Sequence, residues 1–230
     1  MIYITGDTHR DFTRIEDFCA RFDTAAEDVL IILGDAGINY FGDGKDKSLK
    51  QKLLTLPITL FCIHGNHEMR PATVATYEET EWHGGAVYIE REFPNLLFAK
   101  DGEIFKLEGK RCVVIGGAYS VDKHYRQIKG WNWFGDEQPS EKIKAYVERR
   151  LAAENWNADI VLSHTSPLRY EPRETFIQGV DQRKIDKSTE LWLDEIAEKL
   201  TYEKWFCGHY HINKVIDKQR FLFEDIIEFR

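Results

Sequence analysis

Three features that would place a protein in a class at once are missing from this sequence. No two of the four cysteines have a CxxC spacing, so neither a zinc knuckle nor a dithiol redox motif is indicated. No apolar run approaches the roughly 20 residues that cross a bilayer, which argues against a membrane-spanning protein. Basic residues are in deficit, because 31 lysines and arginines face 39 aspartates and glutamates. This balance disfavours binding to a long nucleic acid through its phosphates.

The residues that are present are typical of a globular protein. Hydrophobic residues make up 43% and charged residues 30% of a 230-residue chain, which is long enough to bury one large core. The cysteines lie in apolar runs such as LFCI and RCVVI, so we expect buried free thiols. The chain begins with the strand-like MIYITGD and shows no basic-then-apolar leader. We therefore expect a cytoplasmic protein that forms a single domain over residues 1–230.

The first part of the chain alternates predicted strands and helices. Short runs of branched apolar residues predict buried strands at 2–5, 29–33 and 58–63. Apolar residues at helical spacing predict helices between them, at 12–22 and 49–56. This order of elements predicts a parallel sheet with right-handed crossovers.

The rest of the chain mixes strand directions. The sequence KLEGKRC predicts a hairpin turn, and Ser140 is a candidate N-cap for a helix. A further helix is predicted at 189–200. Strands are predicted at 86–89, 96–99, 103–107, 111–115, 160–162 and 204–207, with antiparallel strands at 215–217, 220–223 and 226–229. The mixture predicts an α/β fold with two packed sheets and helices outside.

Polar clusters follow five of the predicted strands: GDTH, GDAG, GNHE, SHTSP and GHYH. They hold five of the eight histidines, and ligands in α/β sheets bind beyond the carboxyl ends of strands. The groups expected to converge are Asp7, His9, Asp35, Asn66, His67, His164, His209 and His211. Imidazole, carboxylate and amide groups without sulfur suit Mn, Fe, Zn or Ni, and eight groups exceed the needs of one metal.

These motifs resemble, in the same order, those of the calcineurin-like metallophosphoesterases. The resemblance implies a β-sandwich of two mixed sheets flanked by helices, and an enzyme that hydrolyses phosphate esters. The implied ligands are Asp7, His9 and His211 for a first divalent metal, Asn66, His164 and His209 for a second, and Asp35 as the bridge. His64 lies inside the strand before GNHE and is expected to be structural.

The resemblance also implies a mechanism. Two metals, with Mn as the first choice and Fe, Zn or Ni as alternatives, would supply a bridging hydroxide that attacks phosphorus near neutral pH. His67 is expected to titrate near neutrality and to protonate the leaving oxygen. A phosphatase acting on a small molecule or a phosphoprotein is favoured. The alternatives are a phosphodiesterase or nuclease, and a non-catalytic protein-binding scaffold, which the retained ligands and His67 disfavour.

The sequence departs from the family where the phosphate is usually clamped. Phosphoprotein phosphatases of this family follow the bridging Asp with a second Asp and an Arg, where this chain has Ile38 and Asn39. The aromatic residues 131–134 either cover the site or pack on themselves. The candidates to bind phosphate instead are Arg10, which adjoins His9, and Arg70, Lys123 and Arg126.

Overall fold

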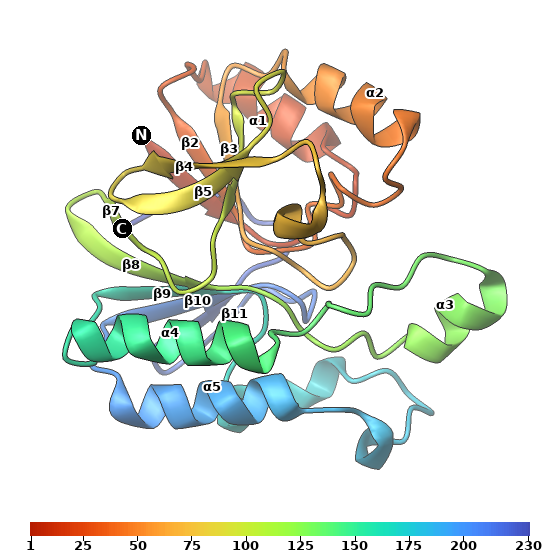
Figure 1. The fold of residues 1–230 in the computed structure, drawn as a ribbon, viewed down its shortest axis with the longest axis vertical. Coiled ribbons are helices and arrows are strands. Elements are labelled where there is room, and N and C mark those ends of the chain that lie inside the picture. Colours follow the sequence, from red (N-terminus) through yellow and green to blue (C-terminus); the bar gives the residue numbers. More distant parts are fainter.

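The computed structural model describes residues 1–230 and stacks two β-sheets between two layers of helices (Figure 1). The seven-stranded sheet is ordered β13 (Ile227–Glu228), β1 (Ile2–Thr5), β2 (Val29–Ile32), β3 (Thr59–Cys62), β6 (Leu96–Ala99), β5 (Gly85–Ile89) and β4 (Glu78–Trp82). The six-stranded sheet is ordered β11 (Lys214–Ile216), β12 (Gln219–Phe221), β10 (Lys204–Cys207), β9 (Ile160–Ser163), β8 (Lys110–Ile115) and β7 (Ile104–Leu107). The predicted sandwich of two mixed sheets is confirmed.

Each sheet has a parallel centre. β1, β2, β3 and β6 pair in parallel in one sheet, and β8, β9, β10 and β12 do so in the other. The strands β7 and β8 form the antiparallel hairpin that KLEGKRC predicts. Because parallel strands all end on the same side, the carboxyl ends in each sheet share one edge, and the loops that follow them can share a site.

Five α-helices accompany the sheets: α1 (Thr13–Phe22), α2 (Gly44–Leu53), α3 (Lys123–Lys129), α4 (Glu141–Ala153) and α5 (Ser188–Lys199). In β2, Leu30 and Ile32 pack in the core that includes residues of α1 and α2, while Val29 and Ile31 pack between the sheets. This alternation follows from the two-residue period of a strand. Each fully buried aliphatic side chain of this kind stabilises the fold by about 1.5–3 kcal/mol.

The far side of the six-stranded sheet is covered by α4 and α5, as Figure 1 shows. Ser140 caps α4 as expected, because its side chain accepts from the amide of Ile143. Trp192 of α5 and Val147 of α4 pack in one core with Trp205 of β10. Both helices therefore pack against the outer face of the six-stranded sheet at β9 and β10. SHTSP and GHYH stand at the carboxyl ends of these two strands.

The structure differs from the sequence prediction at several elements. Helix α2 begins at Gly44, ahead of the apolar residues that predicted it, because Asp43 accepts from the amide of Lys45 at 2.8 Å as an N-cap. Strand β4 was not expected, since its sequence EETEW is charged and forms an exposed sheet edge. Helix α3, also unexpected, buries none of its residues and projects from the body in Figure 1.

The chain ends differently from the expected run of antiparallel strands. β11 and β12 pair antiparallel, but β12 lies parallel to β10, and β13 joins the other sheet by pairing with β1. All four cysteines are buried and free, as predicted. None of the helices is both long and apolar enough to cross a membrane.

Candidate metal centre

A first group of candidate ligands lies where the carboxyl ends of the two sheets meet. Asp7 follows β1, and its Oδ2 lies 3.2 Å from His211 Nε2 and 3.6 Å from His9 Nε2. The two imidazole nitrogens lie 2.9 Å apart. One carboxylate and two imidazoles thus converge from β1 of one sheet and β10 of the other. This donor set suits a divalent transition metal.

A second group lies beside the first and includes Asp35, which follows β2. Asp35 Oδ2 lies 3.6 Å from His164 Nε2 and 3.9 Å from His9 Nδ1, so this carboxylate reaches toward both groups. Ligand atoms of Asp7, Asp35 and His164 all lie within 4.8 Å of one another. The His209 ring packs edge-on against His164, with 5.0 Å between ring centres. Carboxylate and imidazole groups of this kind can hold a divalent metal, and the two groups adjoin each other here.

Asn66 and His164 face each other through two atoms that both accept hydrogen bonds. His164 Nδ1 lies 2.8 Å from the carbonyl oxygen of Leu33, so Nδ1 carries the proton. Asn66 Nδ2 donates to Ser120 Oγ at 2.9 Å, which turns Asn66 Oδ1 toward the imidazole. The unprotonated Nε2 of a neutral ring then lies 2.8 Å from Oδ1. A cation bound by both atoms removes this repulsion, whereas without one a fully buried imidazole must carry a second proton.

Glycines in the motifs make room for ligands that come from other strands. A Cβ on Gly65, after β3, would lie 2.0 Å from Asp35 Oδ1. A Cβ on Gly208, after β10, would lie 2.3 Å from Asp7 Oδ1, which belongs to the other sheet. Both distances are far inside van der Waals contact. The glycines therefore let carboxylates approach the backbone of the neighbouring loop.

The backbone is strained where the ligands project. Four of the predicted ligands have positive φ angles of 45° to 66°: His9, Asp35, His209 and His211. Such angles are uncommon for residues other than glycine, and they concentrate at functional sites. Hydrogen bonds hold the strained segments, since the His209 amide donates to Asp7 Oδ1 at 2.9 Å and the His9 amide to the Asp35 carbonyl at 2.8 Å.

Charges within the cluster set the protonation of the candidate ligands. Burial alone would raise the pKa of Asp7 and Asp35, but the surrounding imidazoles outweigh it and lower both pKa values. Burial, reinforced by His164, lowers the pKa of His209 to about 3. Ionised carboxylates and neutral imidazoles are the forms that bind metals. His211 differs, because its hydrogen bond to Asp7 raises its pKa, so metal binding there would displace a proton.

His67 lies beside these ligands and contacts the candidate bridge. Its amide donates to Asp35 Oδ1 at 2.7 Å, and its Nε2 lies 3.8 Å from Asp35 Oδ2. Burial lowers the pKa of His67; Asp35 opposes this shift and Arg126 adds to it. The neutral form of this ring is therefore favoured more than in a free imidazole. A phosphate bound nearby would favour its protonation.

The arginines considered for phosphate binding have different partners. Arg10 Nη1 pairs with the buried Asp46 at 2.6 Å, and Arg70 Nη1 pairs with Asp101 at 2.6 Å inside the fold. Both guanidinium groups are thereby engaged within the protein. Arg126, on α3, also pairs with a carboxylate, since its Nε lies 2.8 Å from Asp122 Oδ2, but its Nη2 lies 3.4 Å from His67 Nε2. Of the three, Arg126 is the one placed at the candidate acid.

The aromatic residues 131–134 pack against neighbouring side chains. Trp133 Nε1 donates to Glu137 Oε2 at 2.8 Å, and Lys123 Nζ lies 3.8 Å from the centre of the Trp133 ring. Trp131 is 52% exposed and faces solvent. None of the residues 131–134 lines the cavity at the site. Between the two expectations for this loop, the structure favours packing over coverage.

Ser120 and Glu137 support the site, although neither belongs to a predicted motif. Ser120 Oγ donates to Glu137 Oε2, so the same hydroxyl is left to accept from Asn66. Both residues are buried. The Gly116-Gly117 pair after β8 was an available signal, since it begins a sixth loop at the carboxyl edge of the sheets.

Arg14 of α1 is a second support that was not predicted. Its Nη2 donates to the carbonyl oxygens of Asp7 at 2.7 Å and Phe223 at 3.0 Å. The guanidinium thus joins the loop after β1 to the end of the chain behind the first ligand. Nothing in the sequence marks this arginine, because its partners are backbone atoms.

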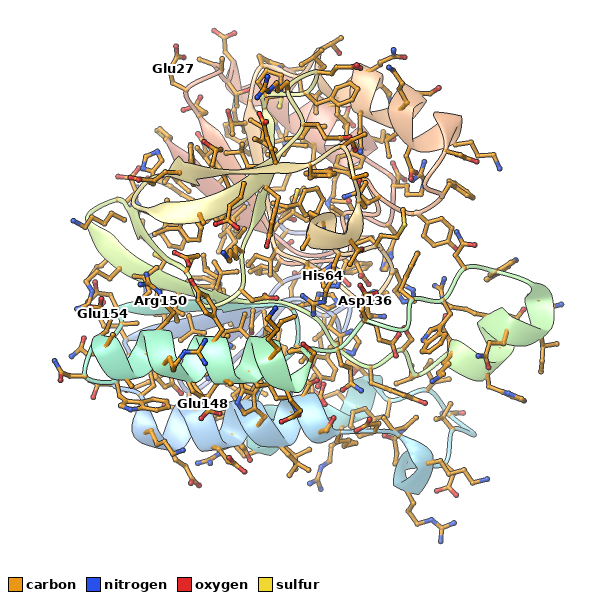
Figure 2. All side chains as sticks on the ribbon, viewed as in Figure 1. Glu27, His64, Asp136, Glu148, Arg150 and Glu154 are labelled. Atoms are coloured by element: carbon orange, nitrogen blue, oxygen red, sulfur yellow. The ribbon has the colours of Figure 1, made fainter.

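His64 has the structural position that the sequence predicted. It is buried in the interior of the fold, where Figure 2 labels it. Neither ring nitrogen has a hydrogen-bond partner, and burial lowers its pKa well below the ordinary value. Its carbonyl accepts from the Gly117 amide at 2.8 Å, so the residue joins the loops after β3 and β8.

Comparison with known proteins identifies the family of this chain. The family model described as calcineurin-like phosphoesterase matches residues 1–213. No curated protein sequence matches the chain. Among solved structures, TT1561 of Thermus thermophilus is 15% identical with a TM-score of 0.45, and covers 90% of this chain and 80% of its own. A second crystal structure is 11% identical with a TM-score of 0.51, and covers 96% and 88%.

AQ665 from Aquifex aeolicus, a protein of unknown function, is 15% identical with a TM-score of 0.34, and covers 74% of this chain and 81% of its own. At these identities the structural similarities concern the fold alone. The family match spans nearly the whole chain, including every cluster from GDTH to GHYH. The chain therefore belongs to the calcineurin-like phosphoesterases, a family of hydrolases that act on phosphoesters with divalent metals.

Proposed function

We propose that this protein is a dinuclear metal-dependent hydrolase of phosphate esters that prefers monoesters. The observation that carries the proposal is the pair of facing acceptors, Asn66 Oδ1 and His164 Nε2, at 2.8 Å. When the His164 ring is neutral both atoms are buried acceptors, and a cation bound by both removes the repulsion between them. The separate group of Asp7, His9 and His211 supplies the donors for another ion.

In this proposal Asp7, His9 and His211 hold the first metal, Asn66, His164 and His209 the second, and Asp35 contacts both. Metals bound there would supply a hydroxide nucleophile near neutral pH and neutralise charge on the phosphoryl group. Manganese is the first choice and iron, zinc or nickel the alternatives, because the donors are imidazole, carboxylate and amide without sulfur.

His67 is the proposed general acid. Its amide bond to Asp35 fixes the backbone beside the bridging carboxylate, and its ring lines the cavity at the site. A proton on Nε2 would pass to the leaving oxygen of the ester. Arg126 lies against the same nitrogen and is the proposed contact for a phosphoryl oxygen.

A monoester is proposed because the chain offers little to hold a polyanion. The formal net charge is −8, and each of the three arginines near the site pairs with a carboxylate: Arg10 with Asp46, Arg70 with Asp101 and Arg126 with Asp122. A nuclease usually contacts several phosphates with basic side chains. The proposed substrate is therefore a small molecule or a phosphoprotein.

Hydrolysis of p-nitrophenyl phosphate and its bis ester by the Mn²⁺-loaded protein tests this function. We expect the monoester to be cleaved faster, and Asp35→Asn to lose both metals together with activity. Asp225→Asn, at an exposed position, is the matched control and should behave as the wild type. Faster cleavage of the bis ester would make the protein a phosphodiesterase. Metal-loaded protein that cleaves neither ester would contradict the proposal.

A further inference from the structure

A cavity of about 250 Å³ opens onto the candidate metal centre. Asn66, His67 and His209 line it on the side of the candidate ligands. The rest of its wall comes mainly from two segments that carry no predicted motif, in the loop after β8 and at 171–187 between β9 and α5. The proposed acid His67 lines this cavity, so a leaving group bound in it would lie within reach of the proton on that ring.

Apolar side chains form much of this wall. Val121 comes from the loop after β8, and Phe176, Val180 and Ile185 come from 171–187. Lys187 Nζ lies 4.6 Å from the centre of the Phe176 ring and holds it by a cation–π contact. A dry apolar cavity of about 150 Å³ is known to hold benzene, so this volume accommodates a ring together with its linking atoms.

The charged groups of the wall either form ion pairs within the protein or are carboxyl groups. Lys187 Nζ binds both carboxylate oxygens of Glu171, at 2.9 and 2.7 Å. Asp122 pairs with Arg126 at 2.8 Å, and Glu190 adds another carboxyl group to the lining. The wall therefore has no free cation for a second phosphate, which would have to be desolvated among carboxylates.

We infer that this cavity receives the alcohol part of the substrate, and that the substrate is the phosphate monoester of a small, largely apolar alcohol. An ester whose alcohol carries a second phosphate is disfavoured by the same wall. The inference rests on the proposed function and names its substrate class. Phe176 is a specificity-determining residue in this assignment.

Kinetics of the full-length Mn²⁺-loaded protein with two esters of primary alcohols test the inference. Benzyl phosphate and glycerol 1-phosphate have similar leaving groups but differ in polarity. We expect kcat/KM to be at least about 10-fold higher for benzyl phosphate, which is the usual scale of discrimination by an apolar pocket. Phe176→Ala should remove most of this preference by slowing benzyl phosphate alone, and Phe176→Leu should remove part of it.

Ile128→Ala is the matched control, because Ile128 is an exposed apolar residue of α3 that does not line the cavity. Its preference should equal that of the wild type. Propane-1,3-diol bisphosphate should react more slowly than propyl phosphate.

Three results would overturn the inference alone while leaving hydrolysis intact. These are equal rates for benzyl phosphate and glycerol 1-phosphate, an equal loss on both esters in Phe176→Ala, and faster cleavage of the bisphosphate. Metal-loaded protein that cleaves none of the esters, p-nitrophenyl phosphate included, would overturn the proposed function and this inference together.

Discussion

Asn66 Oδ1 lies 2.8 Å from His164 Nε2, and the other hydrogen bonds of the two side chains leave both atoms as acceptors when the ring is neutral. Ser120 fixes the amide, and the Leu33 carbonyl fixes the imidazole tautomer. Such outer partners orient metal ligands, and their loss typically weakens metal binding by about 10–100-fold. In the proposed site, an asparagine ligand adds no charge to a buried cluster that already holds two carboxylates.

The role of His67 as proton donor is tested by His67→Gln. Its loss should lower kcat by about 10²–10⁴-fold, the usual contribution of a general acid, and leave the metal content unchanged. His83→Gln is the matched control, since His83 is exposed and lies away from the cavity. Full activity of His67→Gln would show that another group protonates the leaving oxygen.

Arg126 should control the pH dependence of the same step. Its positive charge lowers the pKa of His67, so Arg126→Gln should raise that pKa. A general acid acts only when protonated, so the alkaline limb of the kcat profile should move to higher pH. kcat/KM should fall as well, because a phosphoryl contact is lost. Arg169→Gln, which breaks exposed pairs with Asp194 and Glu198, is the control.

An alkaline limb of Arg126→Gln that stays in place or moves to lower pH would contradict this coupling. A shift of the alkaline limb to higher pH without any loss of kcat/KM would support the electrostatic effect of Arg126 on His67. It would contradict the proposed contact of Arg126 with phosphate.

Gly34 should tolerate no side chain, because a Cβ there would lie 2.0 Å from His164 Nδ1. Its φ is +94°, so alanine also introduces backbone strain. Gly84→Ala separates the two effects, since Gly84 has φ +83° but open space around it. We expect Gly84→Ala to cost about 1–2 kcal/mol and to keep its metals. Gly34→Ala should cost more and bind metal weakly, as thermal unfolding and metal analysis can measure. Equal losses in both variants would mean that the imidazole does not need this space.

Glu190 should make the protein less stable as the pH rises. Burial raises its pKa from 4.5 to about 7, so the folded state keeps a proton that the unfolded chain has lost. The free energy of unfolding should therefore fall between about pH 4.5 and 7 and stay lower above. Glu190→Gln removes this effect and should be more stable than the wild type at pH 8, by up to about 3 kcal/mol, with little difference at pH 4.

Urea unfolding at both pH values measures the difference. Glu195→Gln, at an exposed position of the same helix, is the control and should show no such dependence. A stability gain of Glu190→Gln that is equal at pH 4 and pH 8 would show that the carboxyl group does not titrate as its burial requires.

Sequence patterns predicted the candidate ligands because each one follows a buried strand by only a few residues. Asp7, Asp35 and His164 adjoin apolar runs that form β1, β2 and β9, so the position of the strand gives the position of the ligand. The fold followed from the same runs and from the mixture of strand directions. Elements with charged or short sequences, such as β4 and α3, had no apolar period to reveal them.

Side-chain direction was harder to predict than position. Arg10 adjoins a candidate ligand in sequence, yet its φ of +73° and the buried Asp46 turn its guanidinium into the following loop. Arg126 reaches His67 from a helix 59 residues later in the chain. The bonds from Ser120 to Asn66 and Glu137 likewise depend on tertiary packing between loops. No local pattern encodes such contacts.

The number of metal ions bound per chain tests the central claim most directly. After saturation with Mn²⁺ and removal of excess metal, elemental analysis should find two ions in the wild type. Asn66→Leu, which removes a ligand of the second ion while keeping Asp7, His9 and His211, should retain one. Asn66→Asp should restore the second. A wild-type protein that binds one ion or none, or an Asn66→Leu variant that still binds two, would contradict the account.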